Sequence, residues 1–179
     1  MIREPYLASE DSALLRGALS AYSGESCLEI GAGNGGNLLS LSERFDMVVG
    51  TDVVRPSMPD WRERGANYVL ADGGSCLKDA AFDLVAFNPP YLKTEGAGDV
   101  TVEGGDGLEV PKKFLSEALR VVKQTGRIVM LLNDEAEVDA FRRVCAGKGF
   151  GLRRIGSKRM FFEELSVYEA SSVASPSLA

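Results

Sequence analysis

The sequence predicts an α/β fold with a mainly parallel sheet, helices on both faces and a C-terminal antiparallel hairpin. Short apolar segments alternate with amphipathic segments of helical period along the 179 residues. Most of the short segments are continuously apolar, as expected of strands that are buried on both faces. The last two strand segments follow each other without a helix between them, which indicates an antiparallel pair.

The elements of the first half can be placed from their periodicity. The first helix is expected because Ser9 can cap it, acidic residues occupy its first turn, and leucines and alanines share one face. In order, we expect a helix at Ser9–Tyr22, a strand at Ser26–Ile30, a helix at Asn37–Phe45, a strand at Met47–Asp52, a short helix at Pro59–Arg64 and a strand at Asn67–Ala71.

The second half continues the alternation and ends in a tail. We expect residues 1–169 to form one domain and residues 170–179 to be a disordered, Ser-rich tail. Residues 93–109 are rich in Gly and Asp and too long for a routine connection, which indicates a binding loop or lid. The expected elements are a strand at Phe82–Phe87, a helix at Pro111–Val122, a strand at Arg127–Leu132, a helix at Glu135–Ala146 and strands at Phe150–Gly156 and Phe162–Glu169.

Composition indicates a soluble, cytoplasmic protein. The sequence is 45% hydrophobic and 26% charged, with no apolar run long enough to span a membrane and no signal-peptide core at its start. The net charge is −6, so neither a membrane nor direct binding of nucleic acid is expected. The basic cluster at 153–159 is interpreted as a solvated strand edge.

Cysteine and histidine content narrows the possible chemistry. The chain has no histidine and three scattered cysteines, Cys27, Cys76 and Cys145. Their spacing fits no metal site and no disulfide framework, so we expect no metal and interpret them as small buried hydrophobic residues. Without imidazole, Ser-His and Cys-His nucleophilic mechanisms are excluded.

A glycine-rich segment, Glu29–Gly35, lies where a predicted strand turns into a helix. Glycines permit a tight turn and close approach of a ligand, and the helix that follows offers free N–H groups. The glycines Gly31, Gly33 and Gly36 also satisfy the dinucleotide pattern G-x-G-x-x-G, with Asp52 at a suitable distance to hold a ribose. The segment therefore indicates a nucleoside-bearing ligand without identifying it.

Three carboxylates near successive strand ends favour S-adenosylmethionine over NAD. Glu29 gives the segment the form E-x-G-x-G-x-G, which is typical of methyltransferases. Asp52 can accept hydrogen bonds from both ribose hydroxyls, and Asp72 can accept one from the adenine amino group. Because S-adenosylmethionine carries a sulfonium and no phosphate, acidic surroundings suit it better. The predicted fold is therefore a Rossmann-like class I methyltransferase sheet.

The strand at 82–87 leads directly into Asn88, Pro89, Pro90 and Tyr91. The prolines fix backbone angles and remove donors, which holds nearby carbonyls rigid. An amide or exocyclic NH₂ could donate one hydrogen to the Asn88 side-chain oxygen and the other to the Pro89 carbonyl, while Tyr91 stacks on the acceptor. Catalysis would then rest on positioning and fixed dipoles, in agreement with the absence of histidine. The motif predicts methylation of an amino or amide nitrogen.

With these motifs, the chain resembles the HemK family of protein-glutamine N5-methyltransferases, in particular its short archaeal and eukaryotic branch. This family modifies the Gly-Gly-Gln motif of class I translation release factors. The resemblance covers residues 6 to about 169, although Ala8 stands where the branch has proline. Its further elements are Tyr6 with Glu10–Ser12 and Leu14–Leu15 (Y-x-P-A-E-D-[ST]-x-L-L), the glycine-rich Gly104–Glu109, and Glu163–Val167 (E-x-L-S-V).

The resemblance implies a site, a substrate and a partner. The substrate would be a class I release factor, and the short branch acts with a small zinc-binding activator subunit. An apolar edge strand, Met47–Thr51 or Asn67–Ala71, is a candidate place for such a partner. Implied cofactor contacts are Ser12, Glu29, Gly31, Gly33, Asp52, Asp72, Gly73 and Asn88, and implied catalytic contacts with the substrate are Asn88, Pro89, Pro90 and Tyr91.

Three alternatives remain open. A nucleic-acid N6-adenine methyltransferase can use the same four residues, although the acidic pI and the lack of room for a base-recognition domain oppose it. A protein lysine methyltransferase could place an amine in the same pocket. A non-catalytic scaffold that binds S-adenosylmethionine would not need the intact 88–91 motif.

Overall fold

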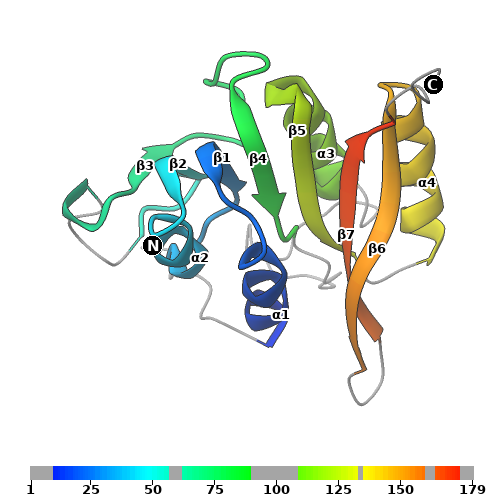
Figure 1. Cartoon of the computed structure of the whole chain (residues 1–179), viewed down its shortest axis with the longest axis horizontal. Helices are drawn as coiled ribbons and strands as arrows, with labels where there is room; N and C mark the ends of the chain where they lie inside the picture. The colour runs from blue at the N-terminus through cyan, green and yellow to red at the C-terminus, as the bar shows by residue number, and fades with distance from the viewer. Residues whose placement is uncertain (1–9, 57–61, 90–108, 133–134, 160–163, 174–179) are drawn as a thin grey trace, which may run out of the picture.

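The structure, a computed structural model, describes residues 10–56, 62–89, 109–132, 135–159 and 164–173. Its centre is a seven-stranded sheet of order β3-β2-β1-β4-β5-β7-β6 (Figure 1). The first five strands are mutually parallel, and β7 runs antiparallel to both β5 and β6, which confirms the expected arrangement. The strands are β1 (Gly24–Ile30), β2 (Phe45–Asp52), β3 (Asn67–Leu70), β4 (Phe82–Phe87), β5 (Val122–Leu132), β6 (Phe150–Arg159) and β7 (Glu164–Ser172).

Helices cover both faces of the sheet. Because strand side chains alternate, neighbouring residues of one strand enter different cores. Leu28 packs in the core beneath α3 and α4, whereas Cys27 packs in the core beneath α1 and α2. The helices are α1 (Glu10–Leu19), α2 (Gly36–Leu41), α3 (Glu109–Val121) and α4 (Glu135–Ala146), with a 3-10 turn η1 (Arg62–Arg64). None of the helices in the described ranges is long and apolar enough to cross a membrane.

Several expected boundaries are corrected by strand pairing. The helix expected to reach Phe45 ends at Leu41, because Phe45 pairs with Gly24 and begins β2. The strand expected from Arg127 begins at Val122, which pairs with Phe82. Hydrogen bonds between strands are a tertiary feature that periodicity along one segment does not reveal.

The C-terminal boundary also differs. Strand β7 continues to Ser172, and Ala170 within it is fully buried. The expected tail at 170–179 is therefore wrong for residues 170–172, because these residues pair with β6. Residues 174–179 lie outside the described part. Of the helix expected at Pro59–Arg64, the described part is the turn at 62–64.

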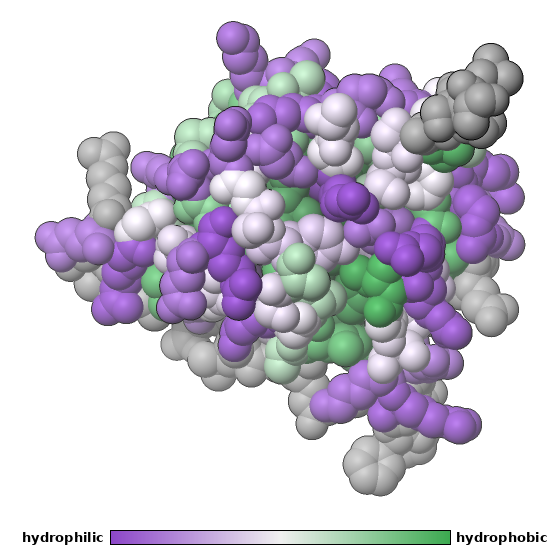
Figure 2. Space-filling model, in the orientation of Figure 1, coloured by the Kyte–Doolittle hydropathy of each residue, from purple (hydrophilic) through white to green (hydrophobic). Residues whose placement is uncertain are grey.

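The two edges of the sheet differ in character. The basic cluster at 153–159 lies in the edge strand β6, where Arg153, Arg154 and Arg159 are exposed, as expected. The opposite edge is β3, and β2 is interior. On the face shown in Figure 2, hydrophilic residues predominate, and a group of hydrophobic residues lies beside α1 and the strands β7 and β6.

The expectation of three buried cysteines holds for two of them. Cys27 and Cys145 are fully buried in the two cores, and burial raises the pKa of both thiols. Cys76 is exposed, contrary to the expectation, because it lies in a turn between β3 and β4 rather than on a packed element.

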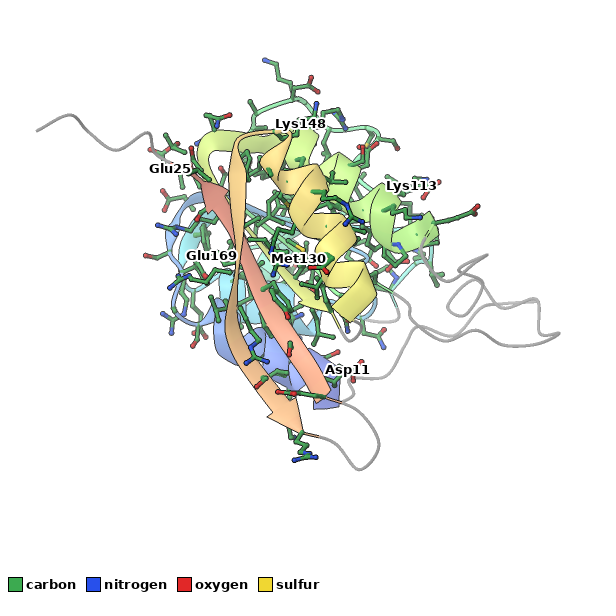
Figure 3. All side chains as sticks on the ribbon, turned by 90° about the vertical axis from the view of Figure 1, so that its right-hand side faces the viewer. Asp11, Glu25, Lys113, Met130, Lys148 and Glu169 are labelled. Atoms are coloured by element: carbon green, nitrogen blue, oxygen red, sulfur yellow. The ribbon has the colours of Figure 1, made fainter. Side chains whose placement is uncertain are left out.

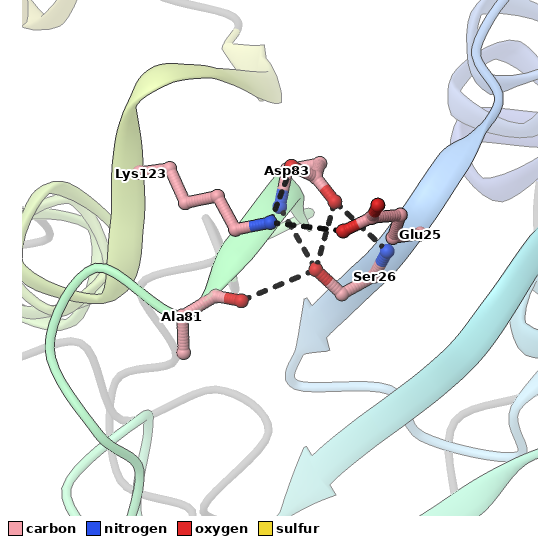
Figure 4. A network of polar contacts seen from close by, with 5 residues as sticks. All are labelled: Glu25, Ser26, Ala81, Asp83 and Lys123. Carbon is pink, nitrogen blue, oxygen red and sulfur yellow. Dashed lines mark hydrogen bonds and ion pairs between the residues drawn. The ribbon is translucent and has the colours of Figure 1, made fainter.

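A polar network joins β1, β4 and β5 near their amino ends (Figure 4). Asp83 on β4 accepts hydrogen bonds from the backbone N–H of Ser26 on β1 (3.0 Å) and from Lys123 Nζ on β5 (2.7 Å). The Ser26 hydroxyl lies 2.9 Å from Asp83 Oδ2 and 3.1 Å from the Ala81 carbonyl oxygen. Burial alone would raise the pKa of Asp83, but the Lys123 ammonium and the Ser26 donors outweigh it and hold the pKa below its usual value.

A buried carboxylate ties the hairpin to β5 and to the connection between α1 and β1. Glu169 on β7 is 3% exposed, and its Oε2 accepts a hydrogen bond from the Tyr22 hydroxyl at 2.6 Å. Its Oε1 lies 3.2 Å from Arg127 on β5 and 3.2 Å from Arg153 on β6. Two guanidinium groups and a hydroxyl compensate the burial of this charge, so the site is a structural crosslink.

Candidate functional site

Those of the expected site residues that the structure describes lie at the carboxyl edge of the sheet. β1 is followed along one side by β2 and β3, while β4 lies on its other side, so the strand order reverses next to β1. Ligands of such sheets bind outside the carboxyl ends of the strands at this reversal. Asp11 lies at this end of the molecule, and Glu25, which forms an ion pair with Lys123 of the polar network (3.7 Å), lies at the opposite end (Figure 3).

The glycine turn has a backbone that requires glycine at alternate positions. Gly31, Gly33 and Gly35 have φ values of 71°, 53° and 70°, in the left-handed region that favours glycine. A Cβ at Gly31 would also come within 2.9 Å of the Phe114 ring. The turn is anchored to β2, because the N–H groups of residues 31 and 32 donate to the Thr51 carbonyl. These alternate positions coincide with the E-x-G-x-G-x-G form.

Asp52 is held beside this turn by backbone donors. Its Oδ2 accepts a hydrogen bond from the Gly33 N–H at 2.8 Å, and its Oδ1 accepts one from the Val54 N–H at 2.8 Å. The Tyr68 hydroxyl on β3 donates to the Gly33 carbonyl at 2.7 Å, which fixes the other side of the turn. Each carboxylate oxygen retains acceptor capacity, so a preoriented Asp52 can bind a pair of hydroxyls.

Glu29 is buried in an incompletely satisfied polar cluster. It is 4% exposed, and its Oε1 accepts a hydrogen bond from Asn37 Nδ2 at 2.6 Å. Its Oε2 is buried and has no hydrogen-bond partner within the described ranges. Burial raises the pKa of Glu29 to about 8; the Asn37 hydrogen bond and the charge of Arg16 oppose the shift, and the charge of Asp52 adds to it. The cluster therefore favours a ligand that brings a donor or a positive charge.

Asn88 follows β4 at the same edge. Its Nδ2 lies 3.5 Å from Asp11 Oδ2 on α1, within hydrogen-bond distance. Its Oδ1 is buried and has no hydrogen-bond partner in the part of the chain that the structure describes. The cross-strand neighbour of Glu29 on β4 is Ala86, two residues before Asn88. An unused amide oxygen therefore lies close to the acidic glycine turn. Pro89 is buried, and Pro90 and Tyr91 lie outside the described residues.

Asp72 and Gly73 follow β3, as expected, but Asp72 forms an ion pair with Lys113 of α3. Both partners are largely exposed, so this pair contributes little to stability and can yield to a ligand. Gly73 is buried and has a φ of 65°. Ser12 is partly buried on α1. It lies in sequence between Asp11, which contacts Asn88, and Arg16, which contacts Asn37.

Sequence reasoning missed the residues that hold the expected ones in place. Their side chains come from other elements, and apart from Asp11, which belongs to the opening Y-x-P-A-E-D-[ST]-x-L-L motif, no motif marks them. A hollow of about 300 Å³ between Tyr22, Asp83 and Arg127 includes none of the expected site residues in its lining. We assign the site from the unpaired polar atoms at the carboxyl edge, because they indicate a ligand chemistry. The missed supporting residues are Asp11, Arg16, Asn37, Tyr68 and Lys113.

Comparison with known proteins agrees with the HemK-family resemblance. No protein-family model matches the chain. A Methanocaldococcus jannaschii protein named as a protein N5-glutamine methyltransferase is 28% identical over 183 residues, which cover 93% of this chain and 91% of the relative. The release factor glutamine methyltransferase of Caulobacter vibrioides is 32% identical over 123 residues, but these cover 56% of this chain and 43% of the relative.

A solved structure shows the same fold. It is the Mtq2–Trm112 complex of E. cuniculi, described as responsible for methylation of the eRF1 translation termination factor. The matched chain superposes with a TM-score of 0.75 at 23% identity, over 96% of this chain and 99% of that one. The expected class I methyltransferase fold is therefore confirmed.

Proposed function

We propose that this chain is a protein-glutamine N5-methyltransferase that uses S-adenosylmethionine and modifies the Gly-Gly-Gln motif of a class I translation release factor. The observation that carries the proposal is the buried, unused Oδ1 of Asn88 beside an acidic glycine turn. A buried acceptor without a partner costs free energy, and an amide NH₂ would satisfy it. The protein would act in the cytoplasm, where release factors work.

The residues present fit S-adenosylmethionine. The unpaired Oε2 of Glu29 suits the positive charge of the methionyl end, which Ser12 of α1 would also contact. The oriented carboxylate of Asp52 suits the ribose hydroxyls, and Asp72 with Gly73 would bind the adenine. No described atom lies within 4 Å of the place that a Cβ at Gly33 would take, so a ligand has room to lie against the backbone of the turn there. A dinucleotide fits less well, because its phosphates would face these carboxylates.

The acceptor side of the site is built to orient an amide. Asp11 accepts a hydrogen bond from Asn88 Nδ2, which leaves Asn88 Oδ1 as the acceptor for the substrate. The Pro89 carbonyl would accept the second amide hydrogen, and Tyr91 would stack on the planar group. When bound, S-adenosylmethionine supplies an electrophilic methyl group. The two acceptors hold the substrate nitrogen in line with it, so that catalysis rests on positioning.

The activator partner fits the β3 edge. Leu70 on β3 is 59% exposed, and Val53, directly after β2, is 52% exposed. The edge strand also offers backbone groups that another chain can pair with. We propose that the small activator binds here, on β3, rather than on the interior strand β2.

The experiment is a methylation assay with labelled S-adenosylmethionine. The chain is incubated with a release factor, with and without a candidate activator, and mass spectrometry locates the methyl group. A release factor whose Gly-Gly-Gln glutamine is replaced by asparagine is the matched control. Label on the glutamine of the first substrate alone supports the proposal. Label on lysine, or on added nucleic acid, would assign the site to one of the alternative acceptors.

A further inference from the structure

Helix α1 contacts both the acceptor side of the proposed site, at Asn88, and its cofactor side, at Asn37. Asp11 near its start contacts Asn88 after β4, and Arg16, further along the helix, contacts Asn37 at the start of α2. Asn37 is 7% exposed. Its Nδ2 donates to Glu29 Oε1 at 2.6 Å, and its Oδ1 accepts a hydrogen bond from Arg16 Nε at 3.2 Å. Both ends of the Asn37 amide are therefore engaged inside the protein.

This arrangement gives the Glu29 carboxyl one defined orientation. One oxygen is held by Asn37, while the other is buried and lacks a donor among the described residues. The oxygen that Asn37 leaves unpaired belongs to the first residue of the E-x-G-x-G-x-G segment. A chain of donors that runs from Arg16 through Asn37 to a third group is typical of the support that ligand-binding residues require.

We propose that Asn37, supported by Arg16, is a positioning residue that fixes Glu29 with Oε2 facing the positively charged methionyl end of S-adenosylmethionine. The inference rests on the proposed function. Neither Asn37 nor Arg16 contacts the cofactor in this arrangement, since both act through Glu29. The effect of replacing either one must therefore disappear when Glu29 itself cannot carry a charge.

A double-mutant cycle on cofactor binding tests the role without measuring activity. Calorimetry at about pH 8 compares the wild type, Asn37→Leu, Glu29→Gln and the double variant. Each single substitution is expected to weaken S-adenosylmethionine binding about 10-fold or more, since each removes a hydrogen bond to a charged group. The double variant is expected to bind no more weakly than Glu29→Gln alone.

Two further variants keep the test independent of folding. Arg16→Met alters a half-buried side chain, and it is expected to weaken binding less than Asn37→Leu, and only while Glu29 is present. Asn67→Leu is the matched control, because it also removes an asparagine hydrogen bond (to the Val48 carbonyl, 3.2 Å), but outside this cluster. Its cofactor affinity is expected to equal that of the wild type. Thermal unfolding identifies any variant that is not folded, and if Asn37→Leu is not, the Arg16 cycle decides.

The outcomes separate the positioning role from the proposed function. Additive losses in the cycle, or unchanged affinity in Asn37→Leu, would overturn the positioning role while the wild type still binds cofactor and methylates its substrate. A wild-type protein that binds no S-adenosylmethionine would overturn the proposed function, and the positioning role with it.

Discussion

Replacing Glu29 by glutamine should stabilise the ligand-free protein relative to the wild type, and increasingly so as the pH rises from 4.5 to about 8. The side chain is 4% exposed, and burial raises its pKa from 4.5 to about 8. The surrounding groups are Arg16 and Asn37, which lower this pKa, and Asp52, which raises it. In the unfolded chain the carboxyl ionises near its ordinary pKa, whereas the folded chain keeps the proton until about pH 8.

The size of the effect follows from proton linkage. Between the two pKa values the folded state binds one more proton than the unfolded state, so the free energy of unfolding falls by about 1.4 kcal/mol per pH unit. This contribution is fully present below the unfolded pKa and is lost as the pH rises through the folded pKa. Glutamine resembles the neutral carboxyl and has no proton to lose. The variant should therefore gain ~2–3 kcal/mol relative to the wild type over two pH units.

The assay is urea unfolding of both ligand-free proteins at about pH 5.5 and pH 7.5. All groups other than Glu29 titrate in both proteins and cancel in the difference. Glu43→Gln, at an exposed glutamate, is measured in parallel as the control. If the difference between Glu29→Gln and wild type is the same at both pH values, Glu29 is ionised in the folded protein and the reasoning is refuted.

Three further predictions concern the cofactor, the acceptor and the sheet. Asp52→Ala should abolish measurable binding of S-adenosylmethionine without unfolding the protein, since the ribose loses its charged acceptor; calorimetry that detects NAD binding instead would contradict it. Asn88→Ala should leave cofactor affinity within a few-fold of wild type and lower turnover by about 100-fold or more; near-normal turnover would remove Asn88 from the mechanism. Because the pKa of Asp83 is lowered, its contribution to stability is present above the unfolded pKa and lost as the pH falls through the folded one. Lys123→Met should therefore lose less stability than the wild type on acidification. If the urea midpoint of Lys123→Met falls with decreasing pH as much as that of the wild type, the pairing of Lys123 with Asp83 does not stabilise the fold.

A last prediction concerns the β3 edge. Leu70→Lys places a charge on an exposed hydrophobic residue of the edge strand and should disrupt binding of the activator while leaving cofactor affinity unchanged. Light scattering and co-purification measure the association. The isolated wild-type chain should be poorly soluble or weakly active without the activator. Full activity of the wild-type chain as a monomer would show that no activator is required.

The sequence by itself determined the fold class and indicated the candidate residues of the site. Continuously apolar strands and alternating helices are local patterns, and they were enough to predict a mainly parallel sheet with a final hairpin. The glycines at 31, 33 and 35 are also local, since a left-handed backbone limits the residue type at its own position. The positions of Asp52 and Asn88 could also be read directly from the chain, because each residue stands where an apolar strand segment ends.

The tertiary structure alone decided which groups hold these residues and what protonation they adopt. Asn37 meets Glu29, and Asp11 meets Asn88, only because α1 and α2 pack on one face of the sheet. The pairing that ends α2 early and extends β7 to Ser172 is likewise a contact between distant segments. Burial, and hence the raised pKa of Glu29, is a property of the assembled core rather than of a segment. Contacts between segments far apart in the chain carry no periodic signal, and this is why motifs indicated the candidate site residues while packing determined their electrostatics.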